Sequence, residues 1–511
     1  MKVVIIGSGI SGLTAAASLA NAGHEVTVFE QFERAGGVTG PFDQHGYKWD
    51  LGQLIIQGLG PGEPGGDVLS DLDIGDKIKI IKDDRGYVFS DFDLRKPEQY
   101  EGTLWRINRL KELFPEEKEG LDKYWKCHLR VISLMTLSRK LEKASGLKAI
   151  WLKIIFFFKL LPLLRKKDWN AQQLMDSFFK SEKLQAVFLA LLADTFTPPD
   201  QFPGLGVFVI NPETAYEKRI SKKLARNTEE VYHYSILGGV STLVDALIEK
   251  IQQNGGEIRT KCPVSKIAIE GNRATGVIDC DGKHIPANVV IASGGAKEAF
   301  LNLVGKEHLP PEFVNQVLEL PLMDSIFMVH LGVDFDPSPY THGTCTYYYG
   351  SYDLYKTIAE AKAGIYHEGR DGFVVHVPTL HSPEMAPPGH HAMTIYTICP
   401  DTLKSGSWGE RKEEYADKLL AYAEERIPGL RDHVMVREIL TPDDFRQRTH
   451  MEHHSFGGLA VVAGKPGIQH KTPIDGLWFV GAQSEGGDAV TNVLTSAHKV
   501  AKMIAAQRPG D

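Results

Sequence analysis

The apolar and polar positions at the N-terminus come in blocks that predict a strand, a helix and a second strand. Residues 2–6 (KVVII) form a short β-branched run that is typical of a buried parallel strand. Residues 13–23 (LTAAASLANAG) are small and mostly apolar and end in glycine, which favours a closely packed helix. Residues 24–30 (HEVTVFE) predict the next strand. We therefore expect a βαβ unit that begins a parallel sheet.

Two distant segments have a similar pattern. After Gly238 and Gly239, an apolar period of about 3.6 residues predicts a helix, and alternating strands follow around Val264 and Ile267. The pair at 281–282 (DG) then predicts a hairpin turn. Near the C-terminus, residues 475–507 indicate a strand, a glycine-rich turn and a helix.

A glycine fingerprint connects the first strand to the first helix. Its residues are Gly7, Ser8, Gly9, Ser11 and Gly12. Gly7 allows the tight turn, Gly9 lets the backbone approach a pyrophosphate, and Gly12 lets helix and strand pack closely. The helix N-terminus offers unpaired N–H groups to the phosphates. Glu30, about 18 residues after Gly12, stands where an acid accepts ribose hydroxyls, so we expect a bound dinucleotide.

The residues after Glu30 indicate which dinucleotide is bound. They include Gln31, Gly36, Gly37, Thr39 and Gly40. This stretch resembles the E-x(5)-G-G-x-x-G segment of flavoproteins of the amine oxidase and phytoene desaturase superfamily. In that superfamily the glycines let the chain run against the pyrophosphate and ribityl chain of FAD. Those families often carry Arg after the glycine pair, whereas Val38 stands here, so we expect one side-chain contact to FAD to be missing.

The resemblance extends to both distant segments. It implies that the backbone of Val264 meets the adenine and that Gly481, followed by Ala482 rather than the usual acid, faces the ribityl phosphate. The helix that begins near Val490 would point at the flavin pyrimidine carbonyl, where its dipole stabilises the negative charge of reduced flavin. No cysteine lies near this segment, so we expect non-covalent FAD.

The resemblance implies an α/β fold with a discontinuous, glutathione-reductase-like Rossmann FAD-binding domain, an inserted α+β substrate domain and a helical cap. We expect the FAD-binding domain to comprise 1–70, 228–300 and 470–511. The substrate-binding domain would comprise 71–227 and 301–469. A second glycine-rich stretch at 58–66 (GLGPGEPGG) contains prolines and follows no recognisable strand, which predicts a loop.

Composition narrows the class of protein. The chain has 511 residues, 42% hydrophobic and 24% charged, which is near the average for folded globular proteins. Its formal net charge of -8 and the lack of a long basic run argue against nucleic-acid binding. Five scattered cysteines without a CxxC pair predict neither a disulfide framework nor a zinc site. They favour a reducing compartment, and we expect a cytoplasmic protein.

The inserted segments suggest a reaction. Residues 186–210 and 374–400 resemble corresponding pieces of phytoene desaturases, carotenoid isomerases and retinol saturases. The resemblance implies an FAD-dependent oxidoreductase that acts on a long hydrophobic polyene or isoprenoid lipid by desaturation, saturation or cis-trans isomerisation, with hydride exchange at flavin N5. A flavin amine oxidase and a non-catalytic flavin-binding partner protein are the alternatives. Without an NAD(P) domain, we expect a quinone, oxygen or another protein as electron partner.

A histidine cluster precedes the last FAD segment. His450, His453 and His454 could bind a metal together with Glu452. No further ligand motif is recognisable and the family relies on flavin, so we expect no metal. His453 or His454 is instead our candidate for a proton carrier near the flavin. The alternative is a polar turn in which these histidines have only structural partners.

The most apolar stretch is 151–167 (WLKIIFFFKLLPLLRKK). It is shorter than the roughly 20 residues that span a bilayer, and Lys153, Lys159 and Pro162 interrupt it. We expect a helical segment, 148–167, that lies shallowly on the inner face of a membrane, with its terminal cations meeting anionic lipid. The alternative is a helix buried in the substrate domain.

Overall fold

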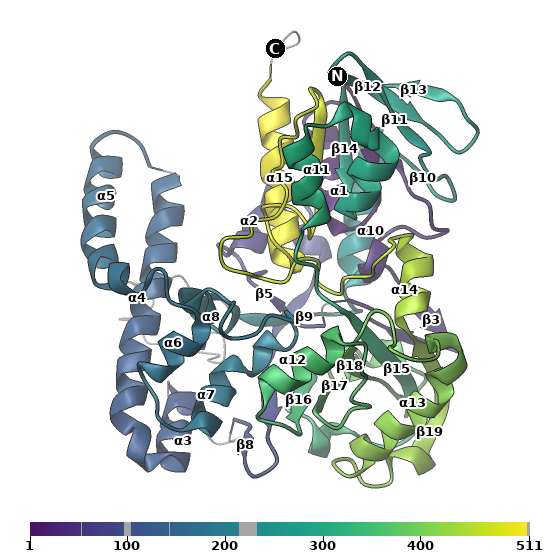
Figure 1. Ribbon diagram of the computed structural model, residues 1–511. Coiled ribbons are helices and arrows are strands. Elements are labelled where there is room, and N and C mark those ends of the chain that lie inside the picture. The colour runs from purple at the N-terminus through teal and green to yellow at the C-terminus, as the bar shows by residue number, and fades with distance from the viewer. Residues whose placement is uncertain (53, 97–103, 143, 214–231, 508–511) are drawn as a thin grey trace.

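The computed structural model describes residues 1–511 apart from 53, 97–103, 143, 214–231 and 508–511 (Figure 1). Its first sheet is parallel, with the strand order β10-β2-β1-β14-β20. The strands are β1 (Lys2–Ile6), β2 (Glu25–Phe29), β10 (Glu257–Arg259), β14 (Val289–Ser293) and β20 (Leu477–Val480). The two strands predicted at the N-terminus are therefore present and pair side by side. The two distant segments supply the other three strands.

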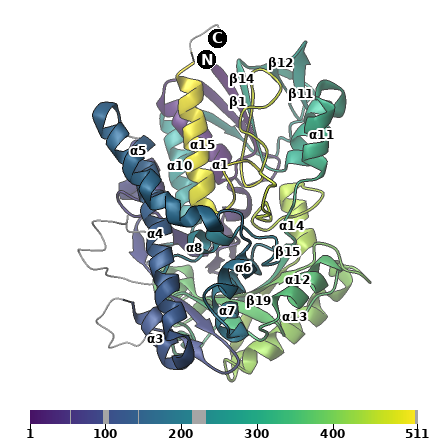
Figure 2. The same ribbon diagram turned by 60° about the vertical axis from the view of Figure 1, so that its left-hand side comes forward.

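Helices pack on one face of this sheet. They are α1 (Ile10–Asn21), α10 (Ser241–Gln253) and α15 (Val490–Ala505). α1 lies between the other two and contacts both. Its Ala15, Ala16 and Ala17 are completely buried, and such small side chains let the helix approach its neighbours closely. Figure 2 shows these helices beside the parallel sheet, with the two described chain ends at the same end of the molecule.

The opposite face carries an antiparallel sheet. It consists of β11 (Lys266–Glu270), β12 (Arg273–Ile278) and β13 (His284–Pro286). Val4 of the parallel sheet packs on this side with Ile267 and Val277. The connection from β12 to β13 contains the predicted turn residues at 281–282, so the hairpin is confirmed. The same core includes α11 (Pro311–Leu318), which lies beyond the boundary at residue 300 expected from the sequence.

A disulfide joins Cys262 to Cys280, contrary to the prediction from the cysteine pattern. The two Cα atoms are 5.0 Å apart although the residues are separated by 18 positions. The antiparallel pairing next to them explains this proximity, since the amide of Ser265 donates to the carbonyl oxygen of Ile278 at 2.9 Å. The prediction was wrong because it weighed local spacing and the odd number of cysteines, and neither reports which strands pair.

A second large sheet is mixed and has seven strands in the order β19-β15-β18-β17-β16-β7-β8. Its strands are β7 (Arg85–Val88), β8 (Asp93–Leu94), β15 (Ser325–Val333), β16 (Cys345–Tyr349), β17 (Gly372–His376), β18 (His391–Cys399) and β19 (Val434–Leu440). β16 and β7 run parallel, and the other neighbours are antiparallel. Flanking helices are α12 (Leu354–Lys362), α13 (Trp408–Glu424) and α14 (Pro442–Thr449).

A helical cap covers the face of this sheet that α13 leaves free. It comprises α3 (Trp105–Leu113), α4 (Lys118–Glu142), α5 (Gly146–Leu160), α6 (Ala171–Asp176), α7 (Glu182–Leu189) and α8 (Val207–Ile210). Tyr124 of α4 and Phe188 of α7 pack in one core with Tyr347 and Tyr396 of the sheet. The cap and the sheet therefore enclose a common interior.

The glycine-rich stretch at 58–66 is not simply the loop that was predicted. A two-residue strand, β5 (Ile56–Gln57), precedes it and pairs with β9 (His233–Ile236), which also pairs with β6 (Ile80–Lys82). Its last residues begin helix α2 (Pro64–Asp71). Proline suits the first turn of a helix, because the N–H that it lacks has no partner there. A strand this short leaves no recognisable apolar pattern.

The segment predicted at 148–167 is helical. α5 covers Gly146–Leu160 and packs against α4, and the two form an arm that projects from the molecule (Figures 1 and 2). No residue of α5 is buried, so the alternative of a buried helix is wrong. Within the residues that the structure describes, no helix has the length and apolar character needed to cross a membrane.

Candidate functional site

A cavity of about 580 Å³ extends from the parallel sheet to the helical cap. One part is formed by the turn between β1 and α1, the segment after β2 and the N-terminus of α15. The other part is formed by β16, β18, α4 and the segment after α7. Segments that lie hundreds of residues apart thus share one space.

The fingerprint glycines have different roles in the geometry of this cavity. A Cβ atom on Gly7 would lie 2.5 Å from the carbonyl oxygen of Ser293, and one on Gly12 would lie 2.1 Å from that of Gly7. These two positions exclude side chains because backbones meet there. A Cβ atom on Gly9 would have no neighbour within 4 Å, and Gly9 borders the cavity. The open space at Gly9 is therefore available to a ligand.

Most of the residues singled out in the sequence line this cavity. They are Gly7, Ser8, Gly9, Ser11, Glu30, Gln31, Gly36, Gly37, Thr39, Gly481, Ala482 and Val490. Gly12, Gly40 and Val264 lie outside its lining, Gly12 because it packs the helix against the strand. His454 lines the cavity, whereas His453 and His450 do not.

Glu30 is held firmly at the edge of the cavity. The backbone amides of Ser8 and Phe32 donate to its carboxylate at 2.9 and 2.8 Å, and the hydroxyl of Ser8 donates to it as well. Such hydrogen bonds to a charged acceptor orient the carboxylate. The arrangement leaves a fixed acceptor where the fingerprint places the ribose hydroxyls.

Arg448 supplies a cation that the sequence pattern did not reveal. Its Nε donates to the carbonyl oxygen of Gly37 at 2.8 Å, and the side chain lines the cavity. Its Nη2 atom is buried and has no hydrogen-bond partner within the described part of the chain. Burial lowers the pKa of the guanidinium, and the charge of Glu30 opposes that shift. A buried donor of this kind fits a phosphate oxygen.

The N-termini of α1 and α15 both face the cavity without a capping side chain. Their helix dipoles favour negative charge on a ligand. Asp488, which lies directly before α15, also lines the cavity, and burial raises the pKa of its carboxyl to about 7. An acid at this place was not anticipated from the sequence.

Comparison with known proteins decides the family. Residues 10–502 match the model for flavin-containing amine oxidoreductases. The chain belongs to this family. This member of the family is an enzyme whose cofactor is FAD. The open space at Gly9, the anchored carboxylate of Glu30 and the unpartnered donor of Arg448 fit that cofactor.

Two curated relatives align over nearly the whole chain. Prolycopene isomerase 1 of an Oncidium hybrid cultivar is 26% identical over 98% of this chain and 83% of its own length. The neurosporene-forming phytoene desaturase of Rhodobacter capsulatus is 24% identical over 98% of this chain and 94% of its own. An oxidoreductase structure from Methanosarcina mazei superposes with a TM-score of 0.63 at 21% identity, covering 98% of this chain and 100% of its own. The last similarity supports the fold alone.

The remainder of the cavity is mainly apolar. Its walls include Leu54, Ile55, Ile132, Leu191, Ile210 and Phe456. A second, polar set interrupts these walls and was missed in the sequence: Arg85, Asp194, Tyr347 and Tyr396. Asp194 could have been noticed as the first charge after the apolar run 186–193. Arg85, Tyr347 and Tyr396 lie on β7, β16 and β18, and the pairing of these strands in one sheet brings them together.

The adjacent histidines have different surroundings. Both ring nitrogens of His453 have partners, Asp401 at 3.1 Å and the carbonyl oxygen of Met323 at 2.7 Å. His454 stacks on Phe445, with ring centroids 4.7 Å apart, and burial lowers its pKa to about 3. Hence only His454 can touch a ligand in the cavity, and it does so as a neutral ring.

Proposed function

We propose that this enzyme acts on a long hydrophobic polyene or isoprenoid lipid, by desaturation, saturation or cis-trans isomerisation of carbon-carbon bonds. The observation that carries the proposal is the continuous cavity, whose apolar walls begin where the FAD segments end. An extended hydrocarbon gains free energy by leaving water for such walls, since burial of apolar surface contributes about 25 cal/mol per Å². The relatives named as a prolycopene isomerase and a phytoene desaturase support the same class of substrate.

FAD supplies or accepts the hydride in such a reaction. We propose that Gly9, Glu30 and Arg448 hold its pyrophosphate and adenosine half, and that the N-terminus of α15 faces its ring system. The apolar walls orient the substrate chain and exclude water from the reacting carbons. A quinone, oxygen or another protein is the proposed electron partner.

We propose further that the arm of α4 and α5 rests on a membrane and receives the substrate from it. Large apolar side chains on α5 are exposed to between 44% and 85%: Leu147, Ile150, Trp151, Ile154, Phe157 and Phe158. They recur every three or four residues, so they share one face of the helix. α4, against which α5 packs, contributes Ile132 and Met135 to the cavity. A lipid would thus have a short path from the membrane to the cavity.

Anaerobic incubation with candidate substrates tests the reaction. Oxidised and reduced enzyme are mixed separately with a phytoene-like, a retinoid-like and an amine substrate, and flavin absorbance and product mass are followed. Loss of two hydrogens with bleaching of the oxidised enzyme indicates a desaturase, and gain of two hydrogens by the product indicates a saturase. Unchanged mass with altered geometry indicates an isomerase. Reduction by amines alone would replace the polyene proposal with an amine oxidase, and no reaction at all would favour a non-catalytic flavin protein.

A further inference from the structure

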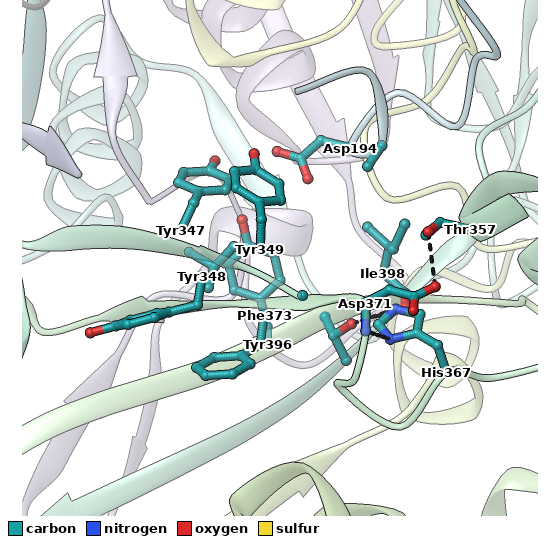
Figure 3. A pocket seen from close by; sticks show the side chains of 14 residues that line it. Asp194, Tyr347, Tyr348, Tyr349, Thr357, His367, Asp371, Phe373, Tyr396 and Ile398 are labelled. Carbon is teal, nitrogen blue, oxygen red and sulfur yellow. Dashed lines mark hydrogen bonds between the residues drawn. The ribbon is translucent and has the colours of Figure 1, made fainter. Parts of the chain in front are cut away.

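Asp194 lies at the junction of two cavities. Asp194 lines the large cavity described above and also a second cavity of about 40 Å³, whose lining side chains are drawn in Figure 3. It follows a turn at Ala190–Leu192 that ends the apolar run after α7. The side chain keeps some accessible surface although it is deep in the protein, because these cavities adjoin it. A carboxyl in this position can exchange a proton with either space.

Charged and hydroxyl groups surround Asp194 on three strands. Arg85 of β7 places positive charge near it, and Tyr347 of β16 lines both cavities with it and lowers its pKa. Tyr396 of β18 interacts with both Asp194 and Tyr347, and Cys345 of β16 is a further titratable neighbour. Burial raises the pKa of Asp194 to about 6, while Arg85 and Tyr347 hold it below the value that burial alone would give. Asp194 is therefore poised to gain or lose a proton near neutral pH.

The small cavity has mainly apolar walls, which a few polar side chains interrupt on the side away from Asp194. Thr357, His367 and Asp371 line its other side, as Figure 3 shows. The hydroxyl of Thr357 donates to the carboxylate of Asp371 at 2.8 Å, and Asp371 is partly exposed. A site for one water needs about 10–15 Å³ and two or more polar partners, so this cavity has room for a short chain of waters. Such a chain would join Asp371 to Asp194 without opening the apolar cavity.

We propose that Asp194 is the catalytic proton donor and acceptor of this enzyme, and that its proton travels through the small cavity by way of Asp371. The proposal rests on the proposed polyene chemistry. Desaturation removes a hydride and a proton from neighbouring carbons: the hydride goes to FAD, and the carboxylate of Asp194 takes the proton. Saturation runs in reverse from the carboxylic acid, and in isomerisation the acid gives one proton and takes one back. His454 is a poor candidate for this role, because burial lowers its pKa to about 3 and its ring is neutral at neutral pH.

The titration of Asp194 can be measured without turnover. Infrared difference spectra of FAD-loaded protein, recorded across pH, report the carbonyl band of protonated carboxyls. Asp50, Glu63 and Asp488 titrate in the same range, so the band is assigned by comparison with Asp194→Asn. We expect Asp194→Asn to lose the part of the carbonyl band that titrates with a midpoint near 6. The control variant Asp281→Asn, which changes an exposed turn, should retain it. An unchanged titration in Asp194→Asn would overturn the proposal.

Activity and exchange test the catalytic role and the route. Asp194→Asn should lower turnover roughly 10²- to 10⁴-fold and abolish the pH dependence near 6, with FAD content unchanged, while Asp194→Glu restores part of both. Wild-type rates and pH profile in Asp194→Asn would refute the catalytic role.

After mixing into D₂O, the Asp194 band should exchange several-fold more slowly in Asp371→Asn and Thr357→Val. Equal exchange would refute the route. If the wild type fails on every polyene, the substrate proposal falls, whereas the infrared titration still decides whether Asp194 exchanges its proton as described.

Discussion

The Nε atom of Arg448 donates a hydrogen bond to the carbonyl oxygen of Gly37 at 2.8 Å. This contact brings a cation from α14 to the glycine pair that follows Glu30, although more than four hundred residues separate the two positions in the chain. Related flavoproteins often carry an arginine directly after that pair, where this chain has Val38. The contact that the sequence seemed to lack is therefore available from another segment.

Arg448→Ala should weaken FAD binding by about 10- to 100-fold. A hydrogen bond to a charged group contributes about 1.5–3 kcal/mol, and about 1.4 kcal/mol corresponds to tenfold in affinity. Arg448→Lys should recover part of this loss, because it keeps the charge but not the forked geometry. Titration of apoprotein with FAD, followed by flavin fluorescence, measures the dissociation constants. Arg437→Ala, on exposed β19, is the matched control, and equal affinity in Arg448→Ala and this control would contradict the prediction.

How well the sequence predicts a feature of this fold depends on how far apart along the chain the interacting residues lie. β1, α1 and β2 follow from residues 2–30, because the apolar pattern and the glycines act over neighbouring positions. Arg448 beside Gly37, and Asp194 beside Tyr347, result from the packing of segments that lie far apart in the chain, which no local pattern specifies. The FAD half could be anticipated because a backbone motif defines it. The substrate half could not, since side chains from several elements build it.

Gly9 and Gly12 should respond differently to the same substitution. Gly9 has a φ of −63° and open space beside it, so Gly9→Val should leave the stability of the apoprotein unchanged while abolishing FAD binding. Gly12→Val places a side chain against the carbonyl oxygen of Gly7 and should cost 1–3 kcal/mol or more, roughly, of folding free energy. Urea unfolding of both apoproteins and their FAD content after reconstitution provide the comparison. Retention of FAD by Gly9→Val would show that the cofactor does not approach this residue.

Removal of exposed aromatic side chains from α5 should abolish membrane binding. Trp151, Phe157 and Phe158 are exposed to 62%, 55% and 65%, whereas Phe156 packs against the core and should be kept. In liposome flotation we expect the wild type to rise with vesicles that contain anionic lipid and the triple serine variant to remain below. A variant with Leu318 and Ile365 changed to serine removes exposed apolar groups elsewhere and should float like the wild type. Equal flotation of all three proteins would argue against a role for α5.

His453 should stabilise the fold more strongly in acid than in base. Burial alone would lower its pKa, but the hydrogen bond and charge of Asp401 outweigh burial and raise the pKa above the usual 6.5. A raised folded-state pKa means that the stabilisation is complete below 6.5 and disappears as pH rises through the folded value. His453→Gln should therefore reduce the free energy of unfolding by about 1 kcal/mol in acid and by less in base.

Urea unfolding at saturating FAD, carried out at a pH below and a pH above the pKa of His453, measures the loss of stability in acid and in base. His284→Gln, at an exposed position of β13, controls for the loss of a histidine side chain at the surface. Asp401→Asn should remove the same pH-dependent component as His453→Gln, because either change breaks the pair that links the segment after α14 to the end of β18. A loss of stability in His453→Gln that is constant with pH would mean that the ring acts through packing and its contact with Met323 rather than through its charge.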